Sequence, residues 1–189
     1  MKTIWVLENI KGNSTFYNKF DLLMMFTSVI QWKKHHPSFT CELHADSLTL
    51  DLFKKLGVLT LWDSVETVKK NSVINKSIFW ASSKLQTLRF VKEPVIIMDN
   101  DFIVYNSLSK FIKDKPVVAH NEDGKGYYIN SSDFYVKKIK HLISRPTSDA
   151  INCSFLYFPN HKFANTYAKI SLEIMEEFTM KKSLIEIIF

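Results

Sequence analysis

A short apolar run that ends in two acids constrains this chain more than any other feature. Residues 94–98 contain three β-branched residues and a methionine, which is typical of a strand buried on both faces. Asp99 and Asp101 follow it directly. In open α/β sheets, ligands bind beyond the carboxyl ends of the strands. Two carboxylates one residue apart can share a hard cation such as Mg²⁺ or Mn²⁺, so this turn is a candidate metal site, and a solvated acidic turn is the alternative.

The remainder of the chain alternates strand-like and helix-like segments. Apolar runs and alternation predict strands at 3–7, 39–44, 58–62, 94–98, 102–105, 116–120 and 150–158. Helical spacing predicts helices at 21–32, 47–56, 77–91, 107–112 and 161–178. Ser47 is a plausible N-cap and Gly57 a C-cap for the second of these helices. The alternation predicts an α/β fold with a mainly parallel central sheet flanked by helices.

Length and composition suit a folded protein with one core. The chain has 189 residues, of which 46% are hydrophobic, and we expect a single domain over residues 1–189. Cys41 and Cys153 do not make a disulfide framework and fit a reducing compartment. The first apolar run is too short for a signal peptide and is broken by Glu8, and no apolar stretch has the length of a membrane span. We therefore expect a cytoplasmic protein without a transmembrane segment.

The positive charge and the histidines have simpler interpretations than a nucleic-acid or zinc site. The net charge is +6, but the lysines are scattered and do not interleave with aromatic residues, so we expect no nucleic-acid partner. His35, His36, His44 and Cys41 are a weak zinc candidate, because adjacent histidines rarely share one tetrahedral site. A solvated helix end explains the histidine pair better.

The segment 79–108 resembles the core of nucleotide-sugar glycosyltransferases with the GT-A fold. In that family a helix carrying a basic residue leads into a buried strand, then a D-x-D motif, then a β-branched strand. Residues 151–158 look like a later strand of the same family. The resemblance covers residues 3–178, and the helix–strand–DxD unit is its one specific motif. It implies a single Rossmann-like GT-A domain.

The resemblance also implies roles for the acidic turn and its surroundings. Asp99 and Asp101 would hold Mn²⁺ or Mg²⁺ against the diphosphate of a nucleoside-diphosphate sugar donor. Lys84 would lie near the donor, with an exposed helix lysine as the alternative, and Arg89 is a weaker candidate. A Lewis-acidic cation neutralises the charge that develops on a leaving diphosphate.

The ends of the first two strands fall where the family holds the nucleotide. Glu8 and Asn9 follow the first strand, and Asp46 follows the second. Asp46 could accept a hydrogen bond from a base ring, and the alternative is an acid at a helix N-terminus. All three are therefore candidates for donor binding.

The acceptor side is less defined. Asn152 is a candidate to contact the donor or acceptor sugar, and Asp149, Glu122 and Asp123 are candidates for a catalytic base. The acceptor would be a glycan, a lipid or a protein. No histidine follows residue 178 to complete a metal shell, and the chain ends on the apolar run 187–189, so we expect a short or truncated member of the family.

Two other classes of protein compete with a metal-dependent glycosyltransferase. A haloacid-dehalogenase-type phosphatase also carries D-x-D after a buried strand, but on its first strand and with a downstream acidic pair that is missing here. A non-catalytic module with a glycosyltransferase-like fold would explain the missing late ligand. Transfer from a nucleotide sugar remains the preferred hypothesis.

Overall fold

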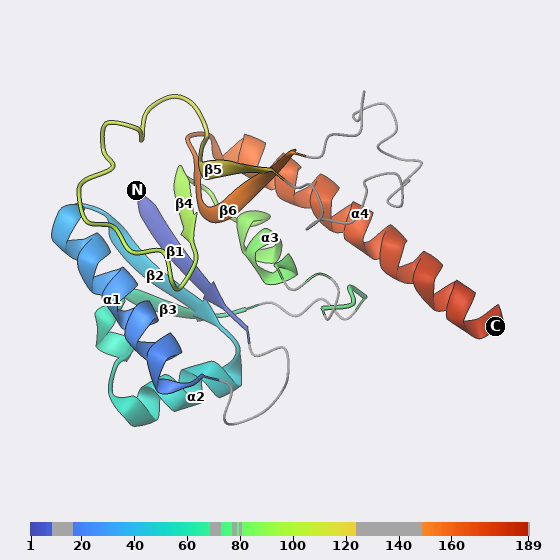
Figure 1. The fold of residues 1–189 in the computed structure, drawn as a ribbon, viewed down its shortest axis with the longest axis horizontal. Helices are drawn as coiled ribbons and strands as arrows, with labels where there is room; N and C mark the ends of the chain where they lie inside the picture. Colours follow the sequence, from blue (N-terminus) through green and yellow to red (C-terminus); the bar gives the residue numbers. More distant parts are fainter. Residues whose placement is uncertain (9–16, 69–72, 77–78, 80, 124–148, 189) are drawn as a thin grey trace.

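The computed structural model describes residues 1–8, 17–68, 73–76, 79, 81–123 and 149–188. Six strands form one sheet in the order β3-β2-β1-β4-β6-β5 (Figure 1). The strands are β1 (Lys2–Leu7), β2 (Thr40–Ala45), β3 (Ser64–Thr67), β4 (Val95–Met98), β5 (Val117–Asp123) and β6 (Asp149–Phe158). The helices are α1 (Lys19–His35), α2 (Ser47–Leu56), α3 (Ser82–Leu88) and α4 (His161–Ile188), with a 3-10 turn at Leu59–Leu61.

The sheet is mainly parallel, which confirms the predicted fold class. β1 is parallel to β2 and β4, and β2 is parallel to β3. β6 is antiparallel to both β4 and β5. The carboxyl ends of β1, β2 and β4 therefore meet at one edge, where Glu8, Asp46 and Asp99 each follow a strand.

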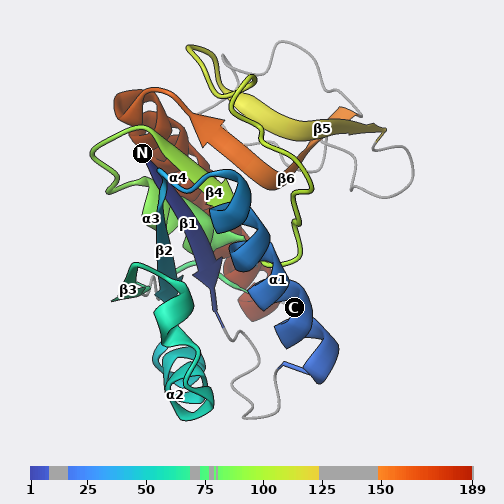
Figure 2. The same cartoon turned by 90° about the vertical axis from the view of Figure 1, so that its left-hand side faces the viewer.

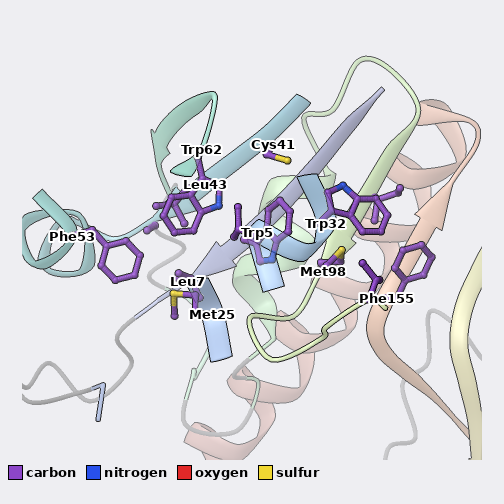
Figure 3. Packing of buried hydrophobic residues seen from close by; sticks show 14 of the residues in the cluster. Trp5, Leu7, Met25, Trp32, Cys41, Leu43, Phe53, Trp62, Met98 and Phe155 are labelled. Carbon is purple, nitrogen blue, oxygen red and sulfur yellow. The ribbon is translucent and has the colours of Figure 1, made fainter. Parts of the chain in front are cut away.

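Helices cover both faces of the sheet (Figures 1 and 2). On one face, Trp5, Leu43 and Met98 of the sheet pack against residues of α1 and α2, as Figure 3 shows. On the other face, Ile4 and Ile97 belong to a second core shared with α3 and α4. Successive strand residues point to opposite faces, so the continuous apolar run of β4 supplies both cores at once.

Local signals mark the ends of α1 and α2, and of the two predicted caps of α2 the glycine is confirmed and the serine is wrong. Asn18 forms a capping box with Asp21 at the start of α1. Gly57 ends α2 with a left-handed φ of 68°, which favours glycine. The N-cap of α2 is Asp46 and not Ser47, because the Asp46 carboxylate accepts the Thr49 N–H at 3.0 Å.

Three predicted elements are wrong, and each has a packing reason. The strand expected at 58–62 is replaced by the 3-10 turn Leu59–Leu61 and by Trp62, whose ring stacks on Phe53 at 5.6 Å, and the strand forms later, at β3. Residues 102–105 form no strand and 107–112 no helix. Side chains hold this segment instead, because His36 Nε2 accepts the Leu108 N–H at 2.9 Å. Its apolar residues pack on the first core and not in a ladder.

A buried serine ties the acidic turn to the first core. Trp5 Nε1 donates to Ser28 Oγ at 3.1 Å, and Ser28 Oγ donates to the Phe102 carbonyl at 2.7 Å. Phe102 is the first residue after Asp101, so this relay fixes where the turn leaves the sheet.

We expect Ser28→Ala to lower the free energy of unfolding by about 1–3 kcal/mol, because the Trp5 N–H and the Phe102 carbonyl each lose their partner. Urea denaturation of the two proteins measures the difference. Ser38→Ala, at an exposed position, is the matched control and should change stability by less than about 0.5 kcal/mol. Equal stabilities for the Ser28 and Ser38 variants would contradict the role of the relay.

Candidate functional site

The Asp99 turn is held by β6 and by α3. The Asp99 N–H donates to the Ser154 carbonyl of β6 at 2.8 Å. The Asp99 carboxylate forms an ion pair with the Lys84 ammonium of α3. Sequence places these three residues far apart, and the order β1-β4-β6 with α3 beneath brings them to one point. A hydrogen bond to β6 and an ion pair with α3 therefore fix the position of this turn.

Lys84 is buried, which excludes the exposed-lysine alternative. The residue is 8% exposed, and all seven residues of α3 are buried. Burial lowers the pKa of the Lys84 ammonium to about 8, while the neighbouring Cys153 and Asp101 act in the opposite direction. Asp101 is itself exposed. Lys84 is therefore paired with Asp99 and also feels the charge of the exposed Asp101.

The position of α3 depends on α4. Asn165 Nδ2 of α4 donates to the carbonyls of Leu88 and Val91, at 2.8 and 3.2 Å, and so binds the end of α3. Ala164 and Ala168 of α4 are completely buried against the second core. Small side chains on α4 allow close packing, which keeps Lys84 directed at the acidic turn.

The other two strand ends carry acids that are also engaged. Glu8 forms an ion pair with Lys76, and its second carboxylate oxygen is buried without a hydrogen-bond partner among the described residues. The Asp46 carboxylate accepts from Thr49 at its N–H (3.0 Å) and its hydroxyl (3.1 Å). Asp46 thus acts as a helix cap, while it lies on the same edge of the sheet as Glu8. Asn9 lies outside the described residues.

The acceptor-side candidates lie on β6 and its neighbour. Asn152 Oδ1 accepts the Ser154 N–H at 2.9 Å, so Asn152 is two residues from the carbonyl that binds Asp99. Asp149 is the first residue of β6 and is in register with Asp123, beside Glu122 of β5. The backbone alone is described there, so their approach to the turn stays a prediction.

Arg89, the weaker donor candidate, has no contact with the acidic turn among the described residues. It is exposed at the end of α3, with its guanidinium 5.8 Å from the centre of the Phe90 ring. Sequence reasoning missed Lys76, Cys153 and Ser154. Lys76 is 68 residues from Glu8, and only strand pairing, which periodicity does not reveal, identifies the backbone partner of Asp99.

The carboxylates at the turn suit a hard cation. Asp99 and Asp101 offer oxygen ligands, and Mg²⁺ is often bound through one or two carboxylates together with substrate phosphates. Within the part of the chain that the structure describes, no group of three His, Cys, Asp or Glu residues could hold a metal by itself. In the same residues, no helix has the length and apolarity that a membrane crossing requires.

Comparison with known proteins gives the fold but no family membership. No family model matches the sequence, and no curated protein matches it. Among solved structures, the apo form of mouse xyloside xylosyltransferase 1 is similar with a TM-score of 0.50 and 9% identity, over 96% of this chain and 74% of that chain. The α/β architecture is accordingly a Rossmann-like fold of the GT-A type.

Two further structures resemble the chain at lower scores. The apo form of the glycosyltransferase GlyE of Streptococcus pneumoniae TIGR4 has a TM-score of 0.48 at 13% identity, over 94% of this chain. The chain spans 39% of the length of that protein. The 4-diphosphocytidyl-2C-methyl-D-erythritol synthase of Anaerococcus prevotii DSM 20548 has a TM-score of 0.47 at 12% identity, over 90% of this chain and 75% of that one.

Proposed function

We propose that this chain is a glycosyltransferase that takes a sugar from a nucleoside-diphosphate donor and transfers it to a glycan, lipid or protein acceptor. The observation that carries the proposal is the ion pair of the buried Lys84 with Asp99, close in sequence to exposed Asp101, at the carboxyl edge of the sheet. Acids at the end of a buried strand and a desolvated cation beside them form a polar centre that packing alone does not require. The GT-A-type fold of the chain is compatible with this reaction.

Each residue has a proposed task. Asp99 and Asp101 would hold Mn²⁺ or Mg²⁺, which when bound supplies a Lewis acid that neutralises the departing diphosphate. Lys84 fixes the orientation of the Asp99 carboxylate and adds positive charge near the leaving group. Glu8 and Asp46 border the nucleotide on the two neighbouring strands.

Acceptor chemistry is assigned to β6. Asn152 contacts one of the two sugars, and Asp149 is a candidate base for the acceptor hydroxyl. Both residues belong to β6, so the acceptor would bind on the side of the turn next to this strand.

Thermal unfolding with a panel of diphosphates tests this function. We expect Mn²⁺ together with UDP, GDP, CDP, ADP or dTDP to raise the midpoint for one nucleotide, because a ligand that binds only the folded state stabilises it. EDTA should cancel the increase. No increase with any nucleotide, together with no slow hydrolysis of the matching nucleotide sugars, would refute the enzyme and favour a non-catalytic module.

A further inference from the structure

A groove of about 570 Å³ lies on the face of the sheet that α3 covers, away from the acidic turn. Lys2, Glu42 and His44 form its floor, and Gln86 and Phe90, from the end of α3 and just beyond it, form a wall. Lys2 is the first residue of β1, whereas the proposed donor site follows the last residues of β1 and β4. The groove includes none of the residues assigned above to the donor or the acceptor.

The floor of the groove is polar because this face changes character between β1 and β2. Ile4 of β1 is in register with Glu42 of β2, and His44 is in register with Glu66 of the edge strand β3. The face is therefore apolar at β1, which α3 covers, and carries carboxylates and an imidazole at β2 and β3. A groove with such a floor suits a ligand with many hydrogen-bonding groups.

The charges in the groove compensate each other. Lys2 Nζ is 2.8 Å from one oxygen of Glu42 and 3.6 Å from Glu93, and His44 Nε2 is 3.3 Å from the other oxygen of Glu42. Three carboxylates, including Glu66, face two lysines, Lys2 and Lys92. The groove has no excess of positive charge, although the whole chain carries +6. Phosphate and nucleotide ligands, which need such an excess, are therefore disfavoured.

Gln86, which lines the groove, has a side-chain amide without a hydrogen-bond acceptor in the described part of the chain. The residue is 8% exposed, and its Nε2 is buried with no hydrogen-bond partner among the described residues. A buried donor without an acceptor destabilises the protein, so a ligand oxygen that accepts from this amide would recover that cost. Phe90 lies close along the chain and is 51% exposed, which gives the same wall an aromatic surface.

We propose that this groove is a binding site for an uncharged saccharide, separate from the donor site. Sugar hydroxyls both accept and donate hydrogen bonds, so one oxygen can accept from Gln86 Nε2, once the side-chain amide turns toward the groove, while another hydroxyl donates to the Glu66 carboxylate. The C–H face of the sugar ring packs on the Phe90 ring. The volume lies within the ordinary range for small-ligand sites and admits more than one sugar unit. This proposal does not depend on the proposed transferase activity.

Titration of ¹⁵N-labelled protein with cellotriose, maltotriose and chitotriose, followed by NMR, tests the site. We expect at least one trisaccharide to shift the side-chain NH₂ signals of Gln86 in a saturable manner. Those signals are assigned by their loss in Gln86→Met. Phe90→Ala, at an exposed position, should weaken the affinity at least about tenfold through loss of the aromatic contact. Gln31→Met, on α1, is the matched control and should leave the titration unchanged.

Several outcomes would overturn the proposal. They are no shift with any of the three sugars, an unchanged affinity in both Gln86→Met and Phe90→Ala, or a larger Gln86 shift with inorganic phosphate than with sugar. Asp101→Asn separates this site from the donor site. It should leave the saccharide titration intact even where it removes the response to Mn²⁺ and nucleotide, and loss of the titration in that variant would also count against a separate groove.

Discussion

Lys84→Met is expected to lower the free energy of unfolding by roughly 2 kcal/mol, because it leaves the Asp99 carboxylate without its cation. Removing one member of a fully buried pair costs about 3–5 kcal/mol, and the smaller figure applies because the Asp99 side chain retains 22% exposure. Chemical denaturation measures the loss. We also expect Mn²⁺ to stabilise Lys84→Met more than the wild type, since a cation at Asp99 replaces the missing ammonium.

A double-mutant cycle separates the ion pair from the packing of the lysine stem. If the pair is responsible, Lys84→Met combined with Asp99→Asn recovers most of the lost stability, because no buried charge is then left unpaired. Lys169→Met on the exposed face of α4 is the control for removing a lysine and should have little effect. Additive losses in the double variant would show that Lys84 and Asp99 act independently.

Asp101→Asn is expected to weaken Mn²⁺-dependent binding of the nucleoside diphosphate by at least about 100-fold, while stability is unchanged. Even residues that only support a metal ligand typically cost 10–100-fold in affinity, and Asp101 is proposed as a direct ligand. Its side chain is exposed, so the substitution leaves no buried group unpaired. Isothermal titration with and without Mn²⁺ gives both affinities.

Asp114→Asn is the matched control, because Asp114 is also an exposed acid in the segment between β4 and β5. It should bind the nucleotide as the wild type does. If both aspartate variants lose affinity equally, the effect comes from net charge; if neither loses affinity, Asp101 is not a ligand.

Strands and helices could be predicted from the sequence where the residue pattern arises from burial within the element or from hydrogen bonds at its ends. Residues 95–98 are buried on both faces, so their apolar pattern and the strand coincide. Gly57 and the polar residues before α1 and α2 mark helix ends through local hydrogen bonds. These signals act over a few residues, and a sequence displays them directly.

Long-range contacts explain what could not be predicted. Alternation at 58–62 and 102–105 comes from packing of Trp62 on Phe53 and of Phe102 on Phe155, at 5.6 and 5.5 Å, and not from strand ladders. In the same way, the burial of Lys84 depends on α4, whose Asn165 is 77 residues from the Leu88 carbonyl that it binds. A lysine on a helix has no local signal that states whether another helix will cover it.

Mn²⁺-induced line broadening in the NMR spectrum of the ¹⁵N-labelled protein, recorded with the nucleoside diphosphate that stabilises it, is the most direct test of the donor site. We predict that substoichiometric Mn²⁺ broadens the backbone signals of residues 99–102 and of Ser154 first, and that Asp101→Asn abolishes this selective loss. Signals of β3 and of the Gln86 groove should persist. Broadening centred on any other part of the chain, or none at all with any nucleotide, would contradict a donor diphosphate held at Asp99 and Asp101.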